Sequence, residues 1–431
     1  MFPSNSIFLL APSLILARAL PARAAEPTWE LRALIQEALD ANPMLRATRL
    51  EAEALAASAG PRGAYEDPVI GYEAQNYPVD TWSAREFGMT GNQLSLAQKI
   101  PFPGKLGHAR REVELRYDAR REAYRARQLE LIREVKRSYL ELYHLQQKRE
   151  ILAERGGLVR TLIAGTRNRY AVGKVSQAEL LNLQLEEAGL LGQGLATERQ
   201  LEGKRADLSA LLGRERSSLP GRAAVPVKQV IDFNRTTEDS LLTRALAHSP
   251  ELGSATTEVQ AAEAGLSRAR WGYLPDFEVK LGYTFRQPSA GDRGVDFVSA
   301  GVGMTLPLWA FSRQAGEVRM AAAEHARSEA LLDGRRQELV RALHDAYAGL
   351  REAAQRLDLY ETGMLPLARQ SVASARTSYL AGRMEYATLL NVISARYQTE
   401  LDYHETMVSY ETRIAELETL VGDGLDAGAR P

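Results

Sequence analysis

Residues 277–285 read FEVKLGYTF, and this stretch decides the fold that the sequence predicts. Its apolar side chains recur at every second position, with charged or small residues between them. Successive side chains of a strand point to opposite faces, so the pattern predicts a strand with one apolar and one polar face. Residues 298–306 repeat the alternation and residues 70–74 carry a shorter form of it. A fourth candidate, residues 87–100, alternates poorly, and we expect a β-bulge at Gly91–Asn92.

These strands have two readings. Two-faced strands are common in soluble sheets, but alternating segments of about ten residues separated by turn residues are typical of membrane barrels. Two hairpins bury too little to stand alone and cannot close a barrel. Since lipid does not tolerate open strand edges, the membrane reading requires oligomerisation, and three chains give a closed barrel with an even number of strands.

The chain also repeats itself at a spacing of about 207–209 residues, the mark of a tandem duplication. The matching stretches are Leu39–Pro43 with Leu246–Pro250, Arg169–Lys174 with Ser378–Arg383, and Leu180–Asn182 with Leu389–Asn391. Each half is predicted to contain a short helix, a second helix, two strands, a very long helix, a turn and a long helix.

The long helices are expected at residues 104–168 and 312–378, with a kink near Pro366, because proline breaks the helical hydrogen-bond pattern. Return helices at 176–212 and 385–421 are shorter, and helices at 43–60 and 250–270 could stack end-on to make up the length. Residues 213–237 are expected to pack midway along the rods. Apolar residues at three-four spacing predict coiled-coil seams: Ile132, Val135, Tyr139 and Leu142; Leu343, Ala346, Leu350, Ala353, Leu357, Tyr360 and Met364; and Tyr403, Met407, Tyr410, Ile414, Leu417 and Val421.

The N-terminus predicts a secretory signal. Residues 7–20 are mostly apolar and are broken by Pro12, and Ala22–Ala24 supplies small residues for cleavage. A buried first helix is the alternative, although Pro12 would break it. We therefore divide the chain into a signal peptide at 1–24, a first repeat at 25–213 (hairpin near 69–100, tip near 169–176), an equatorial segment at 214–237, a second repeat at 238–422 (hairpin near 276–306, tip near 378–385), and a flexible tail at 423–431.

Composition excludes several classes of function. The chain has no cysteine and a net charge near zero, so it offers no thiolate chemistry and no basic footprint for nucleic acid. Its six histidines lack ligand spacing and are expected on helix surfaces. No hydrolase, metalloprotease or phosphate-binding motif is present in the sequence. We therefore expect no enzyme, no cofactor and no metal site.

Two motifs resemble the TolC-like outer-membrane efflux proteins. The turns Arg169–Gly173 and Tyr379–Gly382 resemble the paired Tyr/Phe-x-x-Gly turns at the periplasmic tip of that family. Residues 98–105 (QKIPFPGK) are similar to the strand-to-helix corner of its cation-efflux branch. The resemblance covers essentially the whole mature chain, in order and in duplicate.

The resemblance implies a mostly α fold with a transmembrane β part. A homotrimer would form a twelve-stranded β-barrel in the outer membrane of a Gram-negative bacterium, continuing into a twelve-helix coiled-coil α-barrel in the periplasm. Implied partners are outer-membrane lipid, a periplasmic adaptor (membrane fusion) protein and an inner-membrane pump, often of the resistance-nodulation-division type.

The resemblance also implies site residues. The adaptor would dock on the exposed tips, at Tyr170, Val172, Gly173, Lys174, Tyr379, Gly382 and Arg383. A periplasmic gate would use Glu179, Tyr379, Arg383, Met384, Glu385, Thr388 and Asn391. By position Glu179 and Tyr379 match a pair that holds the closed aperture in the best-known member of the family. That member's gating arginine falls at Met384, although the adjacent Arg383 could substitute for it. Its two lumen aspartates fall at Thr388 and Asn391, so an acidic ring here would be absent or built from Glu385.

The leading prediction is a passive exit duct of a tripartite efflux system, exporting heavy-metal cations or small toxic compounds. The exit duct of type I protein secretion is an alternative with the same architecture. A periplasmic coiled-coil adaptor or scaffold is an alternative of another class, although adaptors usually have one helical hairpin and no whole-chain duplication.

Overall fold

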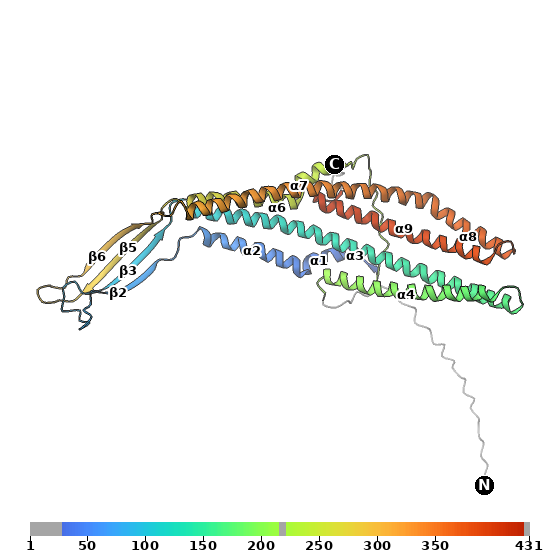
Figure 1. Cartoon of the computed structure of the whole chain (residues 1–431), viewed down its shortest axis with the longest axis horizontal. Helices are drawn as coiled ribbons and strands as arrows, with labels where there is room; N and C mark the ends of the chain where they lie inside the picture. Colours follow the sequence, from blue (N-terminus) through green and yellow to red (C-terminus); the bar gives the residue numbers. More distant parts are fainter. Residues whose placement is uncertain (1–27, 215–220, 426–431) are drawn as a thin grey trace, which may run out of the picture.

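The computed structural model describes residues 28–214 and 221–425, so the predicted signal peptide lies outside the described residues. The described chain is a long rod of helices with a small sheet at one end (Figure 1). Within these two ranges, no helix combines the length and the apolar character that a bilayer crossing requires.

The elements follow the duplicated order that the sequence predicts. The first half contains β1 (Thr28–Trp29), α1 (Leu31–Ala41), α2 (Pro43–Gly63), β2 (Val69–Gln75), β3 (Gly91–Ile100), α3 (Lys105–Ala171) and α4 (Gln177–Leu211). The second half contains β4 (Arg222–Ala223), α5 (Glu238–His248), α6 (Pro250–Trp271), β5 (Phe277–Arg286), β6 (Phe297–Met304), α7 (Arg313–Leu359), the π-helix η1 (Tyr360–Met364), α8 (Leu365–Leu380) and α9 (Tyr386–Val421).

The helices form four parallel columns. The first column is α4 with α2, the second is α3, the third is α9 with α6, and the fourth is α7 with η1 and α8 (Figure 1). With 67 residues, α3 is about 100 Å long at about 1.5 Å per residue. It packs against the first column on one side and the third on the other, and α7 and α8 pack on the far side of the third.

The end-on stacking of short and long helices is confirmed. Where α4 meets α2, the Asn42 amide donates to the Leu211 carbonyl at 2.9 Å, while its oxygen caps α2 by accepting from the Leu45 amide at 2.9 Å. The equivalent junction joins α9 to α6, where Gly422 turns with a φ of 87° against the carbonyl of His248. Gly213 has the same role in the first junction, with a φ of 68° against the carbonyl of Ala41, so a glycine of positive φ is the feature that both junctions share.

Most of the predicted seam residues are buried. The three seams contribute Val135, Tyr139, Leu350, Leu357 and Ile414, among others, to two large apolar clusters. The segment after residue 221 crosses the rods as expected, since the Tyr139 hydroxyl donates to the carbonyls of Trp29 and Ala224 at 3.1 and 3.2 Å.

The predicted kink near Pro366 appears as the π-helix η1, directly before it. Proline has no N–H for the carbonyl four residues earlier, and its ring collides with that carbonyl. A π-turn inserts one residue into the helical phase. For this reason the expected seam position of Met364 is wrong, because its side chain is 38% exposed.

The sheet has the order β2-β3-β5-β6, with every neighbouring pair antiparallel. The expected bulge at Gly91–Asn92 is wrong. From Gly91 onward β3 pairs without interruption with both β2 and β5, because residues 87–90 precede the strand and explain the poor alternation.

Candidate functional site

The two helix turns at the end of the rod have the same backbone geometry. In the first, the amides of Gly173 and Lys174 donate to the carbonyls of Tyr170 and Arg169, both at 2.9 Å. In the second, Gly382 and Arg383 donate to Tyr379 and Ser378 at 3.0 and 2.9 Å. This is the Schellman helix end, and its glycine takes a positive φ, here 72° and 70°.

The predicted docking residues are mostly exposed. Tyr170, Val172, Gly173 and Lys174 form one exposed turn, and Gly382 and Arg383 form the other. No atom lies within 4 Å of the position that a Cβ would take on either glycine. Both turns therefore present open backbone to a partner, with one basic side chain beside each glycine.

The two tips are tied together within the chain through Tyr379. Arg169 at the end of α3 donates from Nη1 to the Tyr379 hydroxyl at 2.8 Å, and its guanidinium carbon lies 5.6 Å from the ring centroid. Within residues 28–214 and 221–425, Glu179 makes no ion pair, and neither does Arg383. The structure thus gives Tyr379 a different partner in its own chain from the expected Glu179.

Below this contact lies an apolar cluster that both hairpins share. Tyr379 packs edge-on against Tyr386 of α9, with ring centroids 6.2 Å apart, and both rings join a cluster with Leu183 and Val159. The Tyr386 hydroxyl is buried without a hydrogen-bond partner. Burial raises the pKa of Tyr386, so the group stays neutral at every physiological pH.

The other predicted gate residues lie on the second hairpin. Met384 packs at the border of an apolar cluster with Leu389 and Tyr397. Glu385 precedes α9, and with Thr388 and Asn391 it is exposed. Their spacing of three residues places these three on one side of the helix. The stripe carries one carboxylate and two neutral polar groups.

Sequence reasoning missed two members of this region. Arg169 lies inside the quoted tip motif, but its counterpart in the second repeat is Ser378, so the repeat gave no signal. Arg155 of α3 pairs with Glu186 of α4 and donates to the Ser394 hydroxyl of α9 at 3.0 Å. It joins three helices, and nothing in its local sequence marks it.

The sheet at the opposite end has two chemically different faces. One face is apolar and exposed in the single chain, and it carries Ile70, Tyr72, Leu94, Leu96, Leu281, Tyr283, Phe285, Val298 and Val302. The other face carries a ladder of polar side chains: Gln75 donates to Gln93 at 2.5 Å, and Gln93 donates to the Ser299 hydroxyl at 3.1 Å. Gly282 makes room for this ladder, because a Cβ there would lie 2.4 Å from the Gln93 amide nitrogen.

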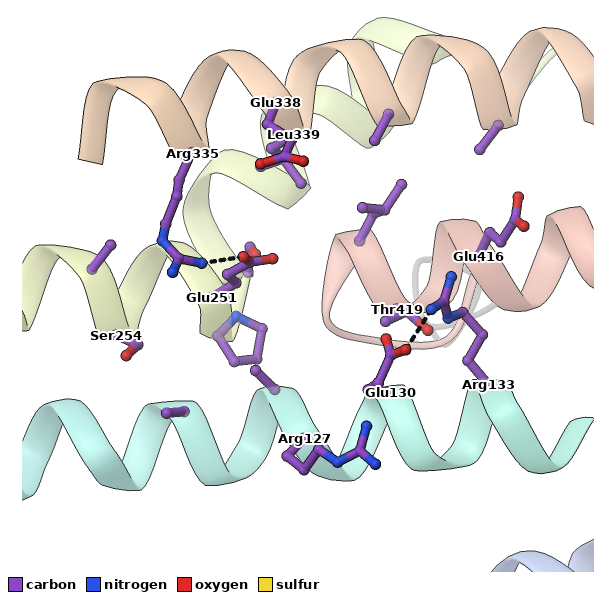
Figure 2. A pocket seen from close by; sticks show the side chains of 18 of the residues that line it. Arg127, Glu130, Arg133, Glu251, Ser254, Arg335, Glu338, Leu339, Glu416 and Thr419 are labelled. Atoms are coloured by element: carbon purple, nitrogen blue, oxygen red, sulfur yellow. Dashed lines mark hydrogen bonds and ion pairs between the residues drawn. The ribbon is translucent and has the colours of Figure 1, made fainter. Parts of the chain in front are cut away.

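A charged cleft of about 740 Å³ lies where α9 ends and α6 begins, between α3 and α7 (Figure 2). Its arginines and carboxylates pair with each other, as Arg335 does with Glu251 and Arg133 with Glu130. In the described part of the chain, no group of three His, Asp or Glu residues is arranged to hold a metal ion.

The expected surface position of the histidines is wrong for two of them. His144 and His404 are mostly buried between helices, and the Tyr143 hydroxyl lies 3.2 Å from Nδ1 of His404. Burial lowers the pKa of both, and that of His404 falls to about 4. These imidazoles are neutral packing groups at neutral pH.

Comparisons with known sequences all point to the same protein family. The model of the outer membrane efflux protein family matches residues 34–214 and 241–423, which covers both repeats. OprJ of Pseudomonas aeruginosa is 26% identical over 428 residues, covering 93% of this chain and 85% of its own length. TolC of Vibrio cholerae is 21% identical over 308 residues, covering 69% of each chain. The alkaline protease secretion protein AprF of P. aeruginosa is 25% identical over 299 residues, covering 68% of this chain and 58% of its own.

Solved structures share the fold. The outer membrane channel CmeC of Campylobacter jejuni superposes with a TM-score of 0.78 at 16% identity, covering 97% of this chain and 94% of that one. CusC superposes with a TM-score of 0.74 at 17% identity, covering 95% and 96%. The fold is thus that of the TolC-type channels, in which a helical barrel continues into a β-barrel.

Proposed function

The chain belongs to the outer membrane efflux protein family, and we propose that three copies of it form the passive exit duct of a tripartite efflux system. It is an outer-membrane efflux protein that extends into the periplasm. Because the chain belongs to this family, we no longer propose the alternative of a periplasmic adaptor or scaffold. The number of copies, the partners and the cargo are the parts that we propose.

The observation that carries the proposal is the alignment of unpaired edges. The sheet ends at β2 and β6, and these strands lead into the two outer helical columns, β2 from α2 and β6 into α7 (Figure 1). Each side of the molecule therefore has both an open strand edge and an outer helical column. Because the two sides differ, the β2 side of one copy must meet the β6 side of the next. Such head-to-tail contacts close into a ring when the rotation from copy to copy completes a full turn, and we propose that it does so here.

The need for a lumen sets the smallest number of copies, which is the number that we propose. Two copies would give eight strands, and an interior of about eight strands is filled by side chains. Three copies of the four-stranded sheet give twelve strands and leave a lumen. The polar ladder of Gln75, Gln93 and Ser299 would line it, and the apolar face would meet lipid.

The helical tips are the proposed docking and gating end. We assign adaptor docking to the exposed turns at Tyr170–Lys174 and Gly382–Arg383, with an inner-membrane pump behind the adaptor. The gate would include Tyr379, held by Arg169, and the stripe Glu385, Thr388 and Asn391. A lumen with few carboxylates would select cations weakly.

We propose heavy-metal cations or small toxic compounds as the cargo, because residues 98–105 resemble the strand-to-helix corner of the cation-efflux branch of the family. A duct need not coordinate what it carries. The similarity to AprF, which by name is an alkaline protease secretion protein, favours protein secretion as the second candidate.

Purification from outer membranes tests the duct itself. We expect an SDS-resistant trimer that forms conducting channels in planar bilayers, and a monomer without channels would contradict the proposal. A deletion strain then separates the cargoes: metal or drug sensitivity supports efflux, and loss of a secreted protein supports type I secretion.

A further inference from the structure

Two corners of the chain, equivalent by the internal repeat, differ in what they contact. The first corner, residues 101–105, follows β3 and is partly buried against residues 271–277, which lead into β5. The ring of Phe102 stacks on Phe277 with centroids 6.3 Å apart. Within the chain the first repeat is thus fastened to the second where helices meet strands.

Polar contacts fix the same joint. Asp276 accepts from the Phe102 amide at 3.0 Å and from Nζ of Lys105 at 2.8 Å, and Lys105 also donates to the Leu274 carbonyl at 2.6 Å. The two ionic side chains are 18% and 25% exposed. One carboxylate therefore receives both the turning backbone and the first side chain of α3.

The corresponding corner of the second repeat has no such cover. Residues 307–313 follow β6, and there Trp309 is 75% and Phe311 96% exposed. The segment equivalent to 271–277 lies before β2, and its Tyr65 is 63% exposed while Asp67 is exposed as well. Large apolar side chains left this open mark an interaction surface.

We propose that residues 307–313 of one copy dock on residues 62–68 of the next copy, reproducing between copies the joint that residues 101–105 and 271–277 make within one. The occupant of this surface is a second copy of this chain. The proposal rests on the ring under the proposed function and names the residues that close it.

The charges complete the equivalence. Asp67 takes the place of Asp276. Each lies three residues before a residue that pairs with the equivalent position of the other strand in its own hairpin: Ile70 with Leu96, and Val279 with Val302. Arg313, the first residue of α7, takes the place of Lys105, the first residue of α3. Among the described residues its side chain forms an ion pair only with Glu317, at 3.5 Å, and this exposed pair contributes little.

The same equivalence predicts a strand register between copies. Within the chain Ile100 pairs with Phe277, the residue after Asp276. In the repeat, Leu306 before Pro307 takes the place of Ile100 before Pro101, and Pro68 after Asp67 takes the place of Phe277 after Asp276. Leu306 would thus lie opposite Pro68 of the next copy, which places Met304 opposite Ile70 and Val302 opposite Tyr72. All four side chains belong to the apolar face, and a slip of one residue would turn one strand's apolar side chains to the polar face.

The sequence has no cysteine, so any cross-link between thiols must come from the cysteine pairs that are introduced. In intact outer membranes, Asp67→Cys combined with Arg313→Cys is treated with a short bifunctional maleimide, and the samples are then heated until the non-covalent trimer dissociates. On the gel, the monomer band should be converted into covalent dimers and trimers. Either single variant should remain monomeric. The matched control, Lys105→Cys with Asp276→Cys, should cross-link at the monomer mass, since that contact lies within one chain.

The register has its own readout. Opposed residues place their Cβ atoms about 4.5–5.5 Å apart, so Val302→Cys with Tyr72→Cys should form a disulfide between copies. Val302→Cys with Gly71→Cys points to opposite faces and should not. The reverse result would overturn the register.

Failure of the joint is distinguishable from failure of the ring. If amine cross-linking shows wild-type trimers but the Asp67/Arg313 cysteine pair stays monomeric, the joint is wrong and the duct stands. If Phe311→Cys then reacts with a lipid-linked maleimide, the corner faces lipid and the joint is again overturned. If the wild-type chain shows no trimer at all, the ring itself is wrong.

Discussion

Arg169 donates a 2.8 Å hydrogen bond to the hydroxyl of Tyr379, so that the tip of the first repeat holds the tip of the second. The arginine lies near the end of α3 and the tyrosine near the end of α8. This contact is a side-chain tie between the tips of the two hairpins, which farther along the rod also share polar contacts such as Arg155 with Ser394. Loosening it should let the tips separate.

Tyr379→Phe should therefore raise single-channel conductance in planar bilayers, because it removes the acceptor and leaves the ring packed on Tyr386. Arg169→Gln should raise conductance as well, and the double variant should add little, since both changes break one bond. Tyr170→Phe, on the exposed turn, is the control.

Glu179→Ala tests whether Tyr379 is held by Arg169, as in the structure, or by Glu179, as the sequence predicts. If Arg169 alone holds Tyr379, conductance is unchanged by this substitution. A clear rise would place the carboxylate in the gate, as the sequence predicts. Unchanged conductance in all three variants would remove these residues from the gate.

The junction glycines are expected to be less replaceable than the tip glycines. Gly382 and Gly422 both have positive φ, 70° and 87°, which costs an alanine about 1–2 kcal/mol. A Cβ on Gly382 meets no atom within 4 Å, whereas on Gly422 it would lie 2.7 Å from the His248 carbonyl oxygen. Gly422→Ala should thus lower the free energy of unfolding more than Gly382→Ala, measured by urea denaturation followed by circular dichroism. Equal losses would mean that the junction relaxes freely.

The polar ladder of the sheet gives a third comparison. Gly282→Ala should weaken the assembled barrel, because the new methyl group displaces Gln93 and Ser299 from their hydrogen bond. Gly301→Ala lies on the same polar face, with no atom within 4 Å of its Cβ position. We expect the SDS-resistant oligomer to dissociate at a lower temperature in the first variant only. The idea is wrong if both variants behave alike.

Acid should loosen the packing around His404. Burial lowers the pKa of His404 to about 4, against about 6.5 in an unfolded chain. The folded state binds this proton less readily, so its stability is full above about pH 6.5 and falls as the pH drops towards 4. His144 beside it is shifted in the same direction. His404→Gln should flatten the decline in thermal stability over this range.

His344 is the matched control for that experiment. Its hydrogen bond with Glu238, 2.9 Å long, raises its pKa. The sign is therefore opposite: this contact stabilises the fold at low pH and is lost as the pH rises through the folded pKa. His344→Gln should not flatten the acid decline, and an identical effect of both substitutions would contradict the assignment.

The sequence predicts those features that depend on local periodicity. Alternation in 277–285 locates β5, and Pro366 locates the break in the fourth column. The repeat also anticipates the two junctions, since Asn42 and Ser249 stand at equivalent places. Element type and order are set by neighbours in the chain, so they can be read from it.

Contacts between distant side chains are not predictable in this way. Arg169 and Tyr379 are 210 residues apart, and the tie depends on how two helices end beside each other. The burial of His404 depends on the packing of α3 against α9, where Tyr143 contacts its ring, and nothing in its own helix distinguishes it from an exposed position. The start and register of β3 could not be predicted from its own residues. Gly91 and Asn92 resemble a β-bulge in the sequence, and only their pairing with β2 and β5 shows that the strand is regular.

The open edges of the sheet have a consequence for biogenesis. A newly exported copy carries an exposed apolar sheet face and two unpaired strand edges, at β2 and β6. Unprotected edges of this kind nucleate aggregation. Assembly of this protein with other copies therefore competes with aggregation in the periplasm. A chaperone that covers β2 and β6 would increase the fraction of chains that reach the assembled state.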